Sequence, residues 1–271
     1  MTIKTENQKP MGLLDLFKKK EEEPKNNSVL LSMPLFNNED SYDLNEIILD
    51  LREFWGLEVT DISGDNETAT FNINGQLVAV AQMPAPIPAE EIEETASYTY
   101  LWNNVLEECS NHTSHALVSM LSGEMDNVER HIIFTQLNAS ILRTSNAIGI
   151  YQGMQTLLLP KALYIDFANL LFEDILPIQL WIYIGLVDEE NSNSAYTYGL
   201  KEFGKTEIEI IESEMQRSDL YDFIIAIASY IIESDVTLND GETIGFTADQ
   251  KIQITESKAK FLEGNSLKLK A

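Results

Sequence analysis

Cysteine, histidine and cationic side chains are scarce in this sequence of 271 residues. Its one cysteine, Cys109, cannot form a disulfide within the chain or supply the several thiolates of a structural zinc site. No apolar run reaches the roughly 20 residues that a membrane-spanning helix needs. The N-terminus also lacks the pattern of a secretory signal, because its lysines follow its apolar patch instead of preceding it. These features predict a cytoplasmic protein in a reducing compartment.

The shortage of cations makes the chain strongly acidic. It has 18 Lys and Arg against 44 Asp and Glu, which gives a formal net charge of -26 at pH 7. Between Ser28 and Asn111, Arg52 is the only cation beside sixteen carboxylates. This region would repel a polyanion, so the sequence predicts no nucleic-acid partner and favours a basic protein partner. A surface that is acidic only for solubility is the plainer alternative.

Residues 1–27 are predicted to form a flexible tail with a short amphipathic segment after Met11, and the sequence leaves open whether translation starts at Met1 or at Met11. If that segment is helical, Leu13, Leu14 and Phe17 share one face. About two turns of helix are marginal in water on their own, and the neighbouring glutamates weaken attraction to a membrane surface. We therefore expect a disordered leader, with docking to a membrane or assembly through these three apolar residues as the alternative.

The body of the chain alternates strand and helix patterns. Asp43 followed by Glu46 resembles a capping box and predicts a helix whose apolar residues recur at helical spacing up to Trp55. The dipeptide Asn74-Gly75 lies between two apolar runs and is a strong hairpin signal. Residues 28–123 therefore read as strand, helix, hairpin strands, helix and strand. That is the βαββαβ order of a ferredoxin-like sandwich.

The second part of the chain repeats this order loosely. We predict a linking helix over residues 124–146, a second α+β half over residues 147–260 and a C-terminal tail over residues 261–271. The expected fold class is α+β, with two ferredoxin-like halves in tandem around antiparallel sheets. The two halves have no detectable sequence identity, so the duplication rests on the order of elements alone.

Six segments of the body resemble one protein family. They are SMPLF from Ser32, FWGLEVTDISGDNETATFNINGQLVAVAQMPAPIP from Phe54, HTSHALVSM from His112, TSNAIGIYQGMQTLLLP from Thr144, TYGLKEFGKTEIEI from Thr197 and DGETIGFTADQKIQIT from Asp240. Together they resemble the uncharacterised bacterial family catalogued as domain of unknown function 4261, over about Ser32 to Thr255. The resemblance implies a family identity and a bacterial source. It implies no activity, because the family has none that can be carried over to any residue.

Few residues are arranged for catalysis or for binding a metal. His112 and His115 lie three apart, but they enter a predicted strand, where such residues point to opposite faces. The sequence has no His-Glu-x-x-His motif, no Gly-x-Ser-x-Gly motif and no glycine-rich phosphate loop with a lysine. We therefore predict no metal and no cofactor. Enzymatic activity stays open, with the balance against it.

Two stretches are candidate ligand-binding sites. Tyr151, Gln152 and Gln155 surround a glycine directly after a buried strand, where a ligand could approach closely. Tyr198 and Lys201 belong to a second group of polar and aromatic residues, which begins at Tyr196. For both stretches the structural alternative is ordinary: tyrosines at a sheet edge, and lysines that protect an exposed strand.

Two functions follow as hypotheses. The first is a non-catalytic protein that binds a basic partner through its acidic surface, such as a toxin domain bound by an immunity protein. The second is an enzyme or small-ligand binder with a pocket near Gln152, Gln155 and His115. A cavity where those three side chains converge would favour the second hypothesis.

Overall fold

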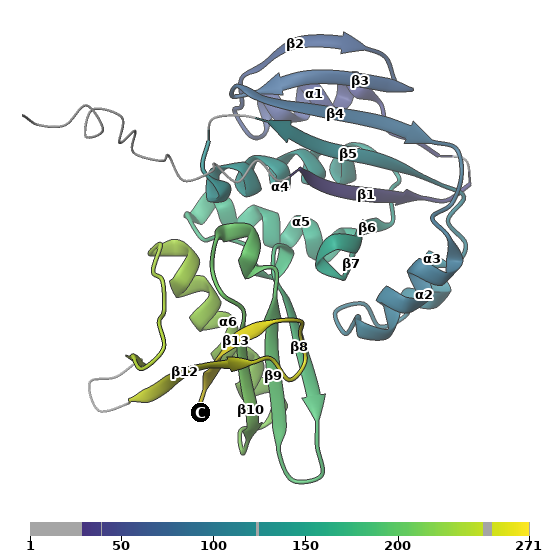
Figure 1. The fold of residues 1–271 in the computed structure, drawn as a ribbon. Helices are drawn as coiled ribbons and strands as arrows, with labels where there is room; N and C mark the ends of the chain where they lie inside the picture. The colour runs from purple at the N-terminus through teal and green to yellow at the C-terminus, as the bar shows by residue number, and fades with distance from the viewer. Residues whose placement is uncertain (1–28, 39, 123–124, 246–250, 271) are drawn as a thin grey trace, which may run out of the picture.

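The computed structural model describes residues 29–38, 40–122, 125–245 and 251–270. The predicted N-terminal tail and its amphipathic segment lie outside these residues. The described residues form two sheets, of seven and six strands, together with six α-helices (Figure 1). The predicted α+β class is confirmed. Among the described residues, none of the helices has the length and apolar character needed to cross a bilayer.

The first sheet has the strand order β2-β3-β4-β5-β1-β6-β7, and all of its neighbouring strands are antiparallel. Its strands are β1 (Leu30–Phe36), β2 (Val59–Gly64), β3 (Thr68–Ile73), β4 (Gln76–Met83), β5 (Ser114–Ser122), β6 (Gly149–Gln152) and β7 (Leu157–Pro160). The predicted turn at Asn74-Gly75 joins β3 to β4. Both turn residues have positive φ angles, 47° and 82°, as a two-residue hairpin of this kind requires.

Helices pack against both faces of the first sheet (Figure 1). On one face lie α1 (Leu44–Glu53), α4 (Asn127–Thr144) and α5 (Lys161–Asn169), and on the other lie α2 (Ala89–Tyr98) and α3 (Val105–Cys109). Helix α1 confirms the helix predicted after Asp43. The side chain of Asp43 caps it by accepting hydrogen bonds from the N–H groups of Asn45 and Glu46.

The second sheet has the strand order β11-β12-β13-β10-β9-β8. Its strands are β8 (Tyr183–Asp188), β9 (Asn193–Tyr198), β10 (Ile208–Ser213), β11 (Thr243–Ile244), β12 (Ile252–Lys258) and β13 (Asn265–Leu269). Helix α6 (Arg217–Glu233) packs against β8 and β9 and shares its apolar core with Ile208 and Ile210 of β10. The opposite face of this sheet carries polar and aromatic side chains.

The predicted tandem of ferredoxin-like halves is not confirmed. In a ferredoxin-like half, the first strand lies between the last strand and a strand of the central hairpin. Here the last strand of the predicted half, β5, lies between the first strand, β1, and the hairpin strand β4. Strands β6 and β7 extend the first sheet, although the sequence analysis placed them in the second half. Part of the predicted C-terminal tail, Asn265–Leu269, is strand β13 and pairs with β10 and β12. Local patterns indicate where strands lie, but pairing between distant segments decides their order.

One apolar core joins the two sheets. Buried side chains of α1, α4, β3, β4, β8, β10 and α6 belong to a single cluster. A smaller cluster lies under α2 and α3 and includes Leu35, Ile92, Tyr151 and Leu158. The two sheets therefore pack together and do not form separate hydrophobic units.

A buried glutamate, Glu207, holds the loop that follows β9. Its side chain is 2% exposed and accepts hydrogen bonds from Thr197 Oγ1 at 2.7 Å and from the N–H of Gly199 at 2.9 Å. Burial raises the pKa of this carboxyl, although the hydrogen bonds act in the opposite direction. Glu207 thereby fixes the backbone on both sides of Tyr198.

A second buried glutamate, Glu209 on β10, holds the segment between β12 and β13. It is 0% exposed and accepts hydrogen bonds from the N–H groups of Lys260 at 3.0 Å and Phe261 at 2.7 Å. It also forms an ion pair with Lys268 of β13 and a hydrogen bond with Ser266 Oγ at 2.8 Å. Burial alone would raise the pKa of Glu209, but these partners hold it below its usual value.

We predict that Glu209→Ala lowers the free energy of unfolding by about 3 kcal/mol, because it leaves Lys268 and two backbone N–H groups without their buried acceptor. Chemical denaturation of both proteins measures the loss. The matched control is Glu256→Ala on β12 of the same sheet, where an exposed carboxylate accepts a hydrogen bond from Asn265 and the expected loss is below about 1 kcal/mol. Equal losses in the two variants would contradict the role given to Glu209.

Candidate functional site

An open cleft lies between α2 and the β8–β9 hairpin, where the two sheets meet. Its volume is about 360 Å³, which lies within the range of sites that hold small organic groups. Five tyrosines line it: Tyr98, Tyr151, Tyr183, Tyr196 and Tyr198. None of the described residues in its lining is Lys or Arg. We call this site the tyrosine cleft.

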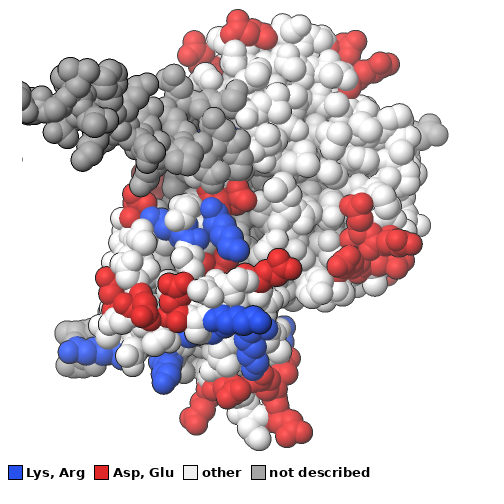
Figure 2. Space-filling view, viewed as in Figure 1, with Lys and Arg blue, Asp and Glu red and all other residues white. Residues whose placement is uncertain are grey.

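Helix α2 forms the acidic wall of the tyrosine cleft. Glu91, Glu94, Thr95 and Tyr98 line it, and their spacing of three, four and seven residues places them on one face of the helix. Within the described chain, neither glutamate forms an ion pair with Lys or Arg. Tyr151 donates a hydrogen bond to Glu91 Oε2 at 3.3 Å. Figure 2 shows carboxylates gathered over α2. This wall therefore presents negative charge that no ion pair with a described Lys or Arg neutralises.

The β8–β9 hairpin forms the aromatic floor of the cleft. Tyr183 lies opposite Tyr198, and Gly185 lies opposite Tyr196, so all four residues point to the same face of the sheet. The rings of Tyr183 and Tyr196 meet edge to face, with their centroids 6.1 Å apart and their planes at 67°. The ring of Tyr196 lies directly over Gly185, so that any Cβ at this position would collide with it. Glycine at 185 therefore makes room for the ring.

The floor is supported by the segment that Glu209 holds in place. Phe261 stacks on Tyr196 with ring centroids 5.4 Å apart and an interplanar angle of 22°. The next residue, Leu262, lines the cleft. Burial raises the pKa of Tyr151 and of Tyr196, so both phenols are neutral at pH 7. The floor thus offers neutral aromatic rings and hydroxyl groups.

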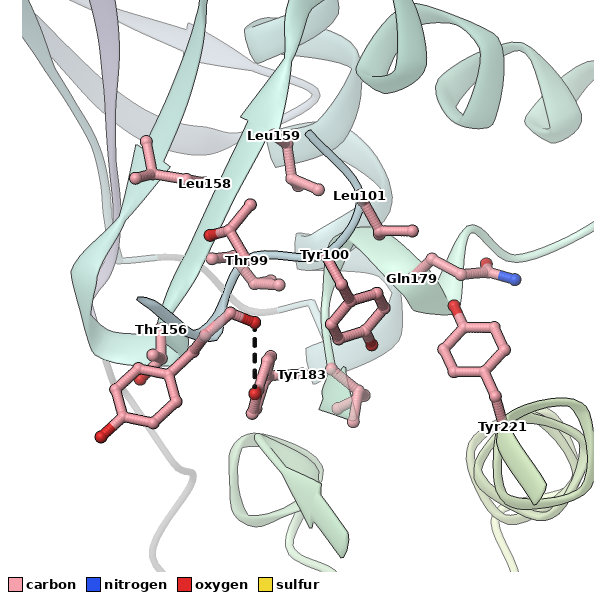
Figure 3. A pocket seen from close by; sticks show the side chains of 12 residues that line it. Thr99, Tyr100, Leu101, Thr156, Leu158, Leu159, Gln179, Tyr183 and Tyr221 are labelled. Atoms are coloured by element: carbon pink, nitrogen blue, oxygen red, sulfur yellow. Dashed lines mark hydrogen bonds between the residues drawn. The ribbon is translucent and has the colours of Figure 1, made fainter. Parts of the chain in front are cut away.

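A narrow crevice adjoins the tyrosine cleft and shares Tyr98, Thr156 and Tyr183 with it (Figure 3). The hydroxyl of Tyr183 donates a hydrogen bond to the carbonyl oxygen of Tyr98 at 3.3 Å, drawn as a dashed line in Figure 3. Tyr221 reaches toward Tyr100 from α6, with ring centroids 6.0 Å apart. The crevice has a volume of about 10 Å³, which is room for about one water molecule. That volume leaves no room for a ligand larger than water.

Seven of the ten tyrosines of the chain line the cleft or the crevice. They come from segments as distant as α2 and α6, so the fold and not the local sequence brings them together. A concentration of this kind sets the region apart from the rest of the protein.

Gln152 and Gln155 line a different, buried cavity. Their side chains are 6% and 8% exposed, and their Oε1 atoms have no hydrogen-bond partner among the described residues. This cavity also has a volume of about 10 Å³, which suits one water molecule bound to polar groups. His131 of α4 lines it too, and burial lowers the pKa of this imidazole to about 4 although Nδ1 contacts Asn127 O at 2.7 Å.

The other predicted site residues do not line the cavity of Gln152 and Gln155. Tyr151 and Tyr198 line the tyrosine cleft, but Gln152 points to the opposite face of the sheet because consecutive strand residues alternate. His115 Nδ1 lies 2.8 Å from Ala85 O, and His115 lines neither the cleft nor the buried cavity. Lys201 is exposed, and its backbone N–H donates to Glu207 Oε1 at 3.3 Å. The three residues of the second hypothesis, Gln152, Gln155 and His115, therefore do not converge.

Sequence reasoning missed the wall on α2 and the contribution of Tyr183. The signal for the wall was present, because Glu91, Glu94 and Tyr98 recur at helical spacing on a predicted helix. The partner of Tyr183 could not be read in the same way. It depends on the register of the β8–β9 hairpin, which the acidic loop between these strands does not specify.

Groups suited to covalent or metal chemistry are few in the described chain. Burial, with a smaller contribution from Glu108, raises the pKa of the Cys109 thiol to about 12, so it is not a thiolate at neutral pH. No group of three or more His, Cys, Asp or Glu side chains among the described residues is placed to hold a metal ion. The tyrosine cleft supplies carboxylate acceptors, hydroxyl groups and aromatic faces.

The fold and the cleft define an α+β protein with two sheets and an acidic, aromatic site at their junction. Residues 196–270 match the model of a family described as domain of unknown function (DUF4261), so the family resemblance predicted from the sequence is confirmed over this segment. The segment includes Tyr196, Tyr198, Glu207 and Glu209. No curated protein and no solved structure matched the chain.

The buried His131 predicts a dependence of stability on pH. Between pH 6.5, its ordinary pKa, and about 4, the unfolded chain binds a proton that the folded chain does not. The free energy of unfolding should therefore decrease as the pH is lowered through this window, by at most about 3 kcal/mol from this group. Urea denaturation at pH 7, 6 and 5 measures the slope.

The variant His131→Phe should flatten that slope, because it keeps an aromatic ring against Trp181 and Phe203 and removes the titrating group. The variant His115→Phe is the comparison. Burial also lowers the pKa of His115, but its side chain is only half-buried, so its removal should flatten the slope less than the removal of His131 does. If His131→Phe keeps the slope of the wild type, the pH dependence does not arise at His131.

Proposed function

We propose that this chain is a non-catalytic binding protein that recognises a basic protein through the tyrosine cleft and the carboxylates around it. The observation that carries the proposal is the lining of the cleft. It combines Glu91 and Glu94, neither of which is paired with a described cation, with five tyrosines. Such a lining favours cationic side chains and repels phosphates and carboxylates.

The charge of the whole chain supports the same proposal. A net charge of -26 creates a negative potential that steers a basic protein toward the surface and raises its rate of association. A cationic toxin domain is one partner of this description, and an immunity-type protein would bind it in this way. With the single cysteine and the family resemblance, we place this function in a bacterial cytoplasm.

A small-ligand pocket at Gln152 and Gln155 has less support. The cavity that they line is about 10 Å³ in volume, so it admits about one water molecule and no substrate. His115 does not line it. No second function is therefore proposed.

The proposal predicts that affinity capture from the native host recovers a basic protein. The double variant Glu91→Lys/Glu94→Lys should weaken its retention by at least about tenfold, because two attractive charges become repulsive. Raising the salt from about 0.1 M to 1 M should release the partner, because the Debye length shrinks from about 10 Å to 3 Å. Quantitative mass spectrometry of the retained protein is the measurement.

The matched control is Glu58→Lys/Glu67→Lys, which makes the same change of charge on two exposed carboxylates beside β2 and β3, at the far end of the first sheet. It should keep most of the partner. Recovery of an acidic partner, binding that salt leaves unchanged, or equal losses in the two double variants would each count against the proposal.

A further inference from the structure

We infer that the tyrosine cleft is a receptor for one guanidinium group, so that the partner inserts an arginine side chain into it. This inference rests on the proposed function and specifies the chemistry of the same site.

The charge of the cleft selects a cation. Its described lining contains two carboxylates and no Lys or Arg, and neither carboxylate is held in an ion pair by a described cation. Two like charges one helical turn apart repel each other, and a cation between them relieves that repulsion. An anion placed there would add to it.

Three of the five rings of the cleft are held by contacts within the protein. The hydroxyl of Tyr183 is bound to Tyr98 O at 3.3 Å, and that of Tyr151 to Glu91 Oε2 at 3.3 Å. Tyr196 is held between Gly185 and Phe261. Aromatic faces attract a cation within about 6 Å of the ring centroid, and fixed rings lose little conformational entropy when they bind it.

The acceptors distinguish guanidinium from other cations. Guanidinium is planar, stacks on aromatic rings and has five N–H donors in a rigid fork that matches carboxylate oxygens. Glu91, Glu94 and Tyr198 all line the cleft, and their oxygens can accept several of these donors. A lysine ammonium has three donors and is more strongly hydrated than guanidinium. A quaternary ammonium has no donors, so the two carboxylates would lose water on binding it without gaining hydrogen bonds.

Titration of the full chain with short blocked peptides tests the inference. The peptides are acetyl-Gly-Xaa-Gly-amide, in which Xaa is arginine, lysine or citrulline, and binding is followed by calorimetry and NMR at low salt. The arginine peptide should bind saturably, the lysine peptide more weakly, and the citrulline peptide, which has the same shape without charge, should not bind. The variants Glu94→Gln and Tyr198→Ala should each weaken arginine binding by about fivefold, which is the scale of one lost charge or ring contact.

Two variants outside the cleft serve as controls, Glu67→Gln on β2–β3 and Tyr230→Ala on α6, each at an exposed position. Both should bind the arginine peptide as the wild type does. Absence of saturable arginine binding, equal binding of citrulline or lysine, or unchanged affinity in both cleft variants would overturn the inference. The proposed function has a separate test, the capture from the host, and it fails when that capture yields no basic partner. The peptide titration does not depend on the capture, so the two failures can be told apart.

Discussion

The polar face of the second sheet depends on two carboxylates buried on and beside β10. Moving a carboxylate out of water costs several kcal/mol unless hydrogen bonds and opposite charge replace its hydration. Around Glu209 the fold supplies the N–H groups of Lys260 and Phe261 and the ammonium of Lys268. The chain after β12 returns to β10, and β13 pairs with it in parallel with Lys268 beside Glu209. A buried charge here specifies the path of the backbone.

The same two carboxylates shape the tyrosine cleft without lining it. Glu209 fixes the N–H of Phe261, which places the phenylalanine ring on Tyr196. Glu207 binds Thr197 and Gly199, the residues on either side of Tyr198. Both tyrosines of β9 are thus oriented by groups behind them, on a rigid hairpin and not on a free loop. A site held in this way can bind with little rearrangement.

The sequence predicted the local elements well and their assembly poorly. The cap at Asp43 and the turn at Asn74-Gly75 are decided by neighbours a few residues away, so their patterns were sufficient. The order of the strands was not readable, since β1 pairs with β5 and β6 across long separations. The same limit affected the site. Tyr151 and Gln152 are adjacent in sequence, but the strand directs them to different cavities.

The tyrosine cleft is built from two parts of the chain with different roles. The segment that matches the family, residues 196–270, contributes Tyr196, Tyr198 and Leu262 and the carboxylates that support them. The acidic wall, Glu91 and Glu94, belongs to α2 and lies outside that segment. The remaining tyrosines of the cleft, Tyr98, Tyr151 and Tyr183, also lie outside it, so the segment alone does not build the cleft. In the proposed guanidinium site, the tyrosines of β8 and β9 would stack on the planar group, and the carboxylates of α2 would supply the preference for positive charge.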